Sequence, residues 1–194
     1  MPGALHHMAI DGKARVLQRL AGNAHAVERH DRVLIAMNQQ DRRPGFGING
    51  MTLIFLPADY REGQAIAVQT DDRIVVAGYR RDAASDAHMV AARLTVIGST
   101  DTSFGGGDGI FVEGIAATHV DSRATSAVLQ SDGRIVIAGW ARKVGGDADY
   151  DMAVVRLNNA GGADATVGQM PEPGRAIVDF SIAGLPRDDR AFSL

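Results

Sequence analysis

The chain has 194 residues and a formal net charge of -3, which gives no strong attraction to nucleic acid or to an anionic membrane surface. It contains no cysteine, so disulfide bonds and thiolate metal sites are excluded. No apolar run is long enough to span a membrane, and residues 1–7 lack the basic and apolar regions of a secretory signal. We therefore expect a soluble protein, either cytoplasmic or part of an exported protein, that binds neither nucleic acid nor membrane.

The first segment, residues 1–23, has the least distinct pattern. Residues 14–20 resemble the later stretch 152–157, which predicts a strand that completes one of the repeats described below. Val16, Leu20 and Val27 would also share one face of a helix, so a helix is the alternative for this segment.

A recurring hairpin pattern begins after this segment. Residues 130–140 predict a strand, a tight turn and a second strand, because Asp132-Gly133 is a strong turn signal and residues 135–138 are apolar and largely β-branched. The same arrangement occurs at residues 69–79 and, in a weaker form, at residues 28–37. A hairpin that recurs in this way indicates a repeat architecture.

Each complete repeat predicts a four-stranded antiparallel meander. In the third repeat the expected strands are residues 124–130, 134–140, 151–157 and 175–180, and in the second they are 65–69, 73–79, 88–94 and 110–114. The first repeat lacks about one strand. We place the repeats at 24–64, 65–123 and 124–190, with 191–194 beginning another strand, and expect an all-β fold of the β-propeller type.

The repeat motifs resemble those of a known family. Gln-x-Asp-Gly-Arg-Ile-x-x-Ala-Gly spans residues 130–139 after Ala124 and Val128, Arg93-Leu94 ends a strand, and Asp-Thr-Ser-Phe-Gly-Gly-Gly-Asp-Gly spans residues 101–109. Together these motifs resemble the delta-60 repeat family of predicted β-propellers. The resemblance covers about residues 24–194 and is weakest at residues 167–171, where the Phe and two of the glycines are lost.

About three repeats are fewer than the four or more blades of a closed propeller. Residues 188–194 resemble residues 121–127, so we expect them to begin the inner strand of another repeat. That strand could pair with residues 14–20 of a second copy and close a ring, most simply as a homodimer. The alternative is that the chain is a piece of a longer repeat protein.

Acidic side chains and histidines occur just before each expected inner strand, where a propeller opens into its central channel. We predict Glu62, His119 and Asp121 as catalytic residues. The predicted ligands of a divalent metal (Ca, Zn or Mn) are His25, Asp59, Asp121, Asp188 and Asp189. In the structural alternative, Asp121 and Asp188 bind turn backbone and pair with Arg123 and Arg190.

Two function classes follow from these features. The first is a binding or interaction scaffold formed by a self-assembled ring, with a partner protein, a small molecule or a glycan as ligand. The alternative is a metal-dependent hydrolase of esters, lactones or phosphotriesters with its site in the channel. Tyr79 and Trp140 occupy one repeat position, and we expect them to pack between repeats rather than to bind sugar.

Overall fold

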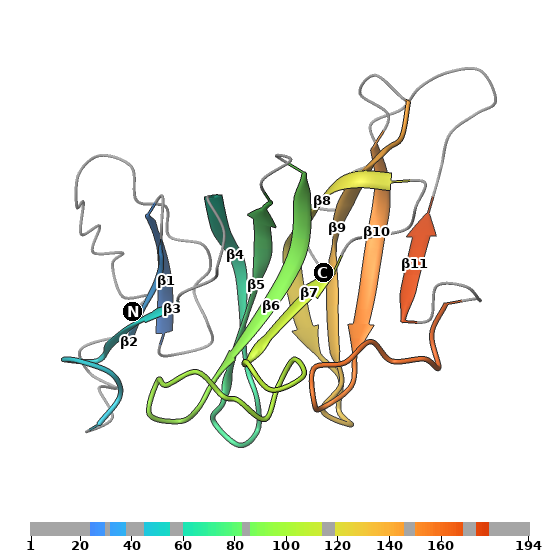
Figure 1. Ribbon diagram of the computed structural model, residues 1–194. Coiled ribbons are helices and arrows are strands. Elements are labelled where there is room, and N and C mark those ends of the chain that lie inside the picture. The colour runs from blue at the N-terminus through green and yellow to red at the C-terminus, as the bar shows by residue number, and fades with distance from the viewer. Residues whose placement is uncertain are drawn as a thin grey trace, which may run out of the picture.

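The computed structural model describes residues 24–29, 32–37, 45–54, 60–82, 86–113, 119–145, 150–168 and 174–178. For residues 24–29, 32–37 and 60–61 it describes the backbone but not the side chains. This part of the chain forms antiparallel sheets and contains no helix (Figure 1). The all-β fold class expected from the sequence is therefore confirmed.

Three sheets follow one another along the chain. The first contains β1 (Ala24–Arg29), β2 (Arg32–Met37) and β3 (Met51–Ile54). The second contains β4 (Tyr60–Val68), β5 (Ile74–Arg81), β6 (Ala87–Leu94) and β7 (Ile110–Glu113). The third contains β8 (His119–Leu129), β9 (Ile135–Lys143), β10 (Tyr150–Leu157) and β11 (Arg175–Val178). Among the described residues, the first sheet has three strands, in the order β1-β2-β3.

The hairpin turns form where the sequence predicted them. In the third sheet Gly133 has a φ of 83°, and Asp72 takes the left-handed conformation with a φ of 66° in the second. The Asp132 carboxylate accepts a hydrogen bond from the backbone N–H of Arg134 at 3.0 Å, which holds the turn. Asp therefore recurs in these turns because its side chain bonds to the backbone two residues later.

The inner strands β4 and β8 are longer than the sequence predicted. They begin at Tyr60 and His119, whereas we expected starts at residues 65 and 124. β-Bulges in both strands allow pairing with β5 and β9 to continue to the ends of those strands. At Gly139 an added Cβ would lie 1.9 Å from the carbonyl oxygen of Arg123, so the bulged strand approaches too closely for any other residue.

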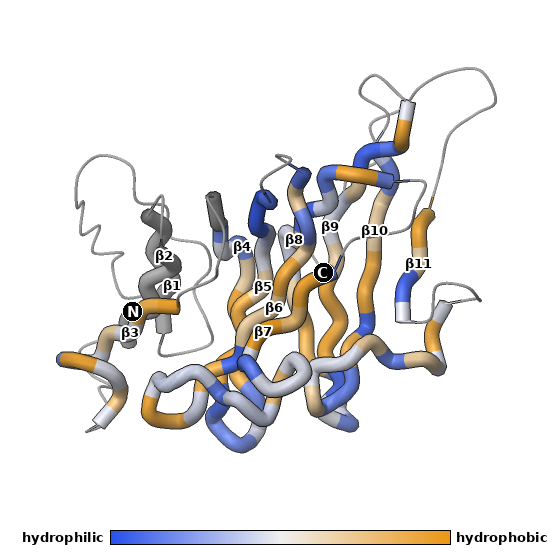
Figure 2. The backbone as a smooth tube through the Cα atoms, in the orientation of Figure 1, coloured by the Kyte–Doolittle hydropathy of each residue, from blue (hydrophilic) through white to orange (hydrophobic). Residues whose placement is uncertain are grey.

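The second and third sheets enclose the main core. Apolar side chains on β5 and β6 pack against apolar side chains on β9 and β10, and Figure 2 shows these hydrophobic segments side by side, with polar turns at their lower ends. The fully buried members include Val75, Ala77, Met89, Ala91, Phe104, Ile135, Ile137, Ala153, Val155 and Leu157. A second cluster, which includes Phe46, Ile54, Ile66 and Val90, lies between the first and second sheets.

Neighbouring sheets are joined by one repeated contact. The backbone N–H of Gly105 donates to the carbonyl of Ala160 at 2.9 Å, and the ring of Phe104 packs against Gly161. Between the first and second sheets, Gly47 donates to Ile97 at 2.9 Å, and Phe46 packs against Gly98. The same contact at both junctions means that each sheet follows the previous one in an equivalent way, as blades do in a propeller.

Candidate functional site

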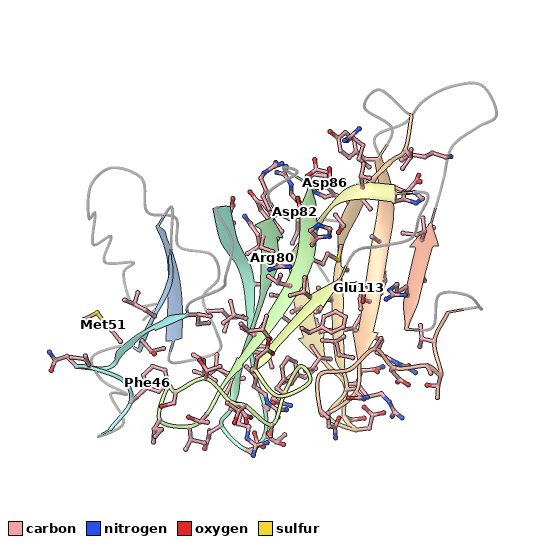
Figure 3. All side chains as sticks on the ribbon, viewed as in Figure 1. Phe46, Met51, Arg80, Asp82, Asp86 and Glu113 are labelled. Carbon is pink, nitrogen blue, oxygen red and sulfur yellow. The ribbon has the colours of Figure 1, made fainter. Side chains whose placement is uncertain are left out.

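A polar cluster lies at the junction of the second and third sheets. The guanidinium of Arg123 lies 4.5 Å from the ring centre of Tyr79 and 4.9 Å from that of Trp140. The Tyr79 hydroxyl donates to Glu62 at 2.6 Å. Both rings are buried and contact the same cation, which Tyr79 reaches from the second sheet and Trp140 from the third. Figure 3 shows Arg80, Asp82 and Asp86 close together at the upper end of the second sheet.

A second polar pair, His119 and Asp151, connects β8 to β10. The distance between His119 Nε2 and Asp151 Oδ2 is 2.6 Å, and the two side chains are 7% and 2% exposed. Asp151 Oδ1 is buried and has no hydrogen-bond partner among the described residues. This pair can orient an imidazole, but catalysis or metal binding would also require a nucleophile or a third ligand.

Two of the predicted catalytic residues, Glu62 and Asp121, belong to the polar cluster around Tyr79 and Arg123, whereas His119 lies in the second polar pair. His119 pairs with Asp151, Glu62 accepts a hydrogen bond from Tyr79, and Asp121 forms ion pairs with Arg123 at 3.1 Å and Arg81 at 3.7 Å. The pairing of Asp121 with Arg123 is the ion pair that the structural alternative expected. Our prediction that these three residues precede the inner strands is wrong, because the bulges extend β4 and β8 across them.

The predicted metal ligands fall largely on other parts of the chain. Asp59, Asp188 and Asp189 lie outside the described residues, and for His25 only the backbone path is described. Across the described ranges, no group of three or more His, Asp or Glu side chains could hold a metal ion. The divalent metal therefore stays a prediction.

Each complete sheet carries an Arg–Asp network at its lower end. Arg93 Nε donates to Asp101 at 2.7 Å, and Arg156 Nε donates to Asp164 at 2.9 Å. Hydrogen bonds from the backbone amide and hydroxyl of Thr166, then the charges of Arg156 and Arg134, lower the pKa of Asp164 to about 2. The signal for this network in the sequence is an Arg followed eight residues later by Asp in both repeats.

The Asp101 carboxyl is subject to opposing effects. Burial raises its pKa, but hydrogen bonds from the hydroxyl and backbone amide of Ser103, with the charge and hydrogen bond of Arg93, lower it further. The net result is a pKa below the usual value for Asp. Both networks are therefore ionised near neutral pH, and they hold the turns that make the contacts between sheets.

The face of the third sheet that points away from the second sheet is named the outer face. Strand register places Val128, Val136 and Arg156 in one row across it, Trp140 and Met152 in another, and Val154 between them. The matched positions of the second sheet are covered by the third: Val75, Met89 and Ala91 are each 0% exposed. On the outer face, Val136, Met152 and Val154 are half-exposed and Val128 is 37% exposed.

The outer face also carries hydrogen-bond donors. The equivalent donors of the second sheet have acceptors in the third sheet. Arg93 Nη1 donates to the carbonyl of Asn159 in the third sheet at 2.6 Å, whereas Arg156 Nη1 has no acceptor within the described parts of the chain. Gly105 donates to Ala160, but Gly168, which occupies the matched position, has no backbone acceptor there. The outer face therefore has both the apolar surface and the donors of a junction between sheets.

Comparison with known proteins agrees with this architecture. Residues 69–104 and 130–166 match the family described as "Domain of unknown function (DUF5122) beta-propeller". Each match runs from the first hairpin turn through the Arg–Asp network, so it covers equivalent parts of the second and third sheets. The chain is similar to β-propeller repeats. No match to a curated protein was found.

None of the described segments forms a helix that is long and apolar enough to cross a membrane.

Proposed function

We propose that this chain is a partial β-propeller of delta-60-type repeats that self-assembles into a closed ring and serves as a binding scaffold. The observation that supports the proposal is the outer face of the third sheet. It has apolar residues at the positions that are buried between the second and third sheets, and at Val136, Met152 and Val154 they are half-exposed. A further sheet on this face would bury them and accept hydrogen bonds from Arg156 and Gly168.

We propose that a second copy contributes strands to that further sheet. Repetition of an interface already present in the chain needs no new type of contact, and a homodimer is the commonest assembly of soluble proteins. The completed ring would present its rim and channel to a partner protein, a small molecule or a glycan.

The test is the solution mass of the full chain, measured by light scattering over a range of protein concentrations. We expect a mass of at least two chains, and we expect Val154→Glu to reduce it to one chain because a carboxylate would be buried in the new interface. The matched control is Val144→Glu, since Val144 is 55% exposed and follows β9 outside the outer face. A single-chain mass for the unsubstituted protein at every concentration would contradict self-assembly.

The metal-dependent hydrolase stays a prediction from the sequence. Of its proposed ligands, His25, Asp59, Asp188 and Asp189 lie in segments whose side chains are not described, and Asp121 forms ion pairs with Arg123 and Arg81.

A further inference from the structure

The C-terminal residues repeat the residues that begin β8. Asp188-Asp189-Arg190-Ala191 corresponds to Asp121-Ser122-Arg123-Ala124, although residues 188–194 themselves lie outside the described part of the chain. We propose that residues 187–194 form the inner strand of the next sheet and dock on the outer face, with Arg190 against Trp140 and Asp188 beside Arg142. This inference rests on the proposed propeller assembly and names the first segment to occupy the outer face.

The start of β8 shows how such a strand docks on the sheet before it. Arg123 places its guanidinium 4.5 Å from the ring centre of Tyr79, and Asp121 forms an ion pair with Arg81 at 3.7 Å. Between them, the hydroxyl of Ser122 accepts a hydrogen bond from the backbone N–H of Met89 at 3.1 Å. Three consecutive residues of β8 thus contact three positions of the second sheet.

The third sheet has the corresponding partners on its outer face. Strand register matches Tyr79 with Trp140, Arg81 with Arg142 and Met89 with Met152. Arg142 has no hydrogen bond or ion pair to any described residue, whereas Arg81 pairs with Asp121. Arg142 therefore has no partner among the described residues, at the position where the second sheet pairs Arg81 with Asp121.

The C-terminal residues complement these three positions. Asp188 would pair with Arg142 as Asp121 pairs with Arg81, and Arg190 would cover Trp140 as Arg123 covers Tyr79. Asp189 replaces Ser122, and its carboxylate can accept a hydrogen bond from the backbone N–H of Met152. All three contacts arise from one register of the segment, so the loss of one contact should weaken the other two.

Trp140 is the single tryptophan of the chain, so its fluorescence reports on this contact. We would measure acrylamide quenching and the emission maximum of the full chain and of Arg190→Gln. Loss of the cation–π contact should lower the ratio of docked to undocked segment about two- to fivefold, which raises the quenching constant and shifts emission to longer wavelength. The matched control is Arg73→Gln, which removes a cation from the hairpin turn of the second sheet, away from the outer face, and should leave both values unchanged.

A charge exchange separates a direct contact from a general loss of structure. We expect Asp188→Arg and Arg142→Asp each to raise the quenching of Trp140, because each places like charges together. The double variant Asp188→Arg/Arg142→Asp should restore the value of the unsubstituted chain. Restoration supports docking. Equal quenching in all four proteins, or no restoration, would overturn it.

Protein concentration and solution mass complete the test. If the quenching of Trp140 does not change on dilution, the segment docks on its own chain. If the quenching rises on dilution, docking within one chain is overturned and the segment is assigned to a second copy. A single-chain mass, with the quenching effects of the variants intact, would contradict the closed ring and support the docked strand. An oligomer whose Trp140 quenching is unaffected by Arg190→Gln would support assembly and contradict the docked strand.

Discussion

The second and third sheets carry similar residues at matched positions but differ in what covers them. β6 is buried on both faces because it lies between two sheets, whereas β10 alternates between buried and half-exposed residues. Arg93 donates hydrogen bonds to its own sheet and to the next one, while Arg156, among the described residues, donates to Asp164 and Thr166 of its own sheet. The repeat sequence thus encodes a two-sided unit, and the number of covered sides depends on its neighbours.

The largest expected difference concerns the aromatic contact between sheets. Phe104 is fully buried against Gly161, so Phe104→Ala should lower the free energy of unfolding by about 3–5 kcal/mol. Val167 occupies the matched position in the third sheet and is half-buried, so Val167→Ala should cost about 1 kcal/mol or less. Urea unfolding of the two variants measures both values. Equal losses would contradict the difference between the two sheets.

A matched pair of methionines gives a smaller effect. Met89 is 0% exposed, so Met89→Ala should cost about 2–4 kcal/mol, whereas Met152→Ala should cost less than about 1 kcal/mol in a single-chain protein. The measurement is urea unfolding in the Val154→Glu background, which is expected to be monomeric. If the outer face is covered in the assembly, the cost of Met152→Ala should increase when Val154 is retained. An unchanged cost would argue that Met152 remains exposed in the assembled protein.

The smallest expected effect is in the acid range. The pKa of Asp164 falls from about 3.8 in the unfolded chain to about 2 in the folded one, so its contribution to stability is present above pH 4 and is lost as the pH falls toward 2. Asp164→Asn should therefore flatten the decline in stability with falling pH, measured by thermal unfolding at a series of pH values.

Thr166→Val is the companion variant for this prediction. It removes the hydroxyl that donates to Asp164 at 2.8 Å but keeps the backbone amide bond, so it should raise the pKa of Asp164 and move the loss of stability to higher pH. If neither variant altered the pH dependence, the Arg156–Asp164 network would make no contribution in this range.

The sequence alone determined the all-β class, the positions of the hairpin turns and the antiparallel order of the strands in the two four-stranded sheets. These features depend on local chemistry: Asp and Gly in a tight turn, and a β-branched run after it. Such signals act over a few residues and can be recognised without knowledge of the rest of the fold.

Only the tertiary structure decided how far the inner strands extend and which side chains meet. The bulges in β4 and β8 depend on pairing with β5 and β9, and they place Glu62, His119 and Asp121 within strands. The stacking of Arg123 between Tyr79 and Trp140 joins two sheets, so the sequence could identify the matched rings but not the cation between them. Local patterns specify the unit, whereas contacts between units depend on strand register and on the packing of one sheet against the next.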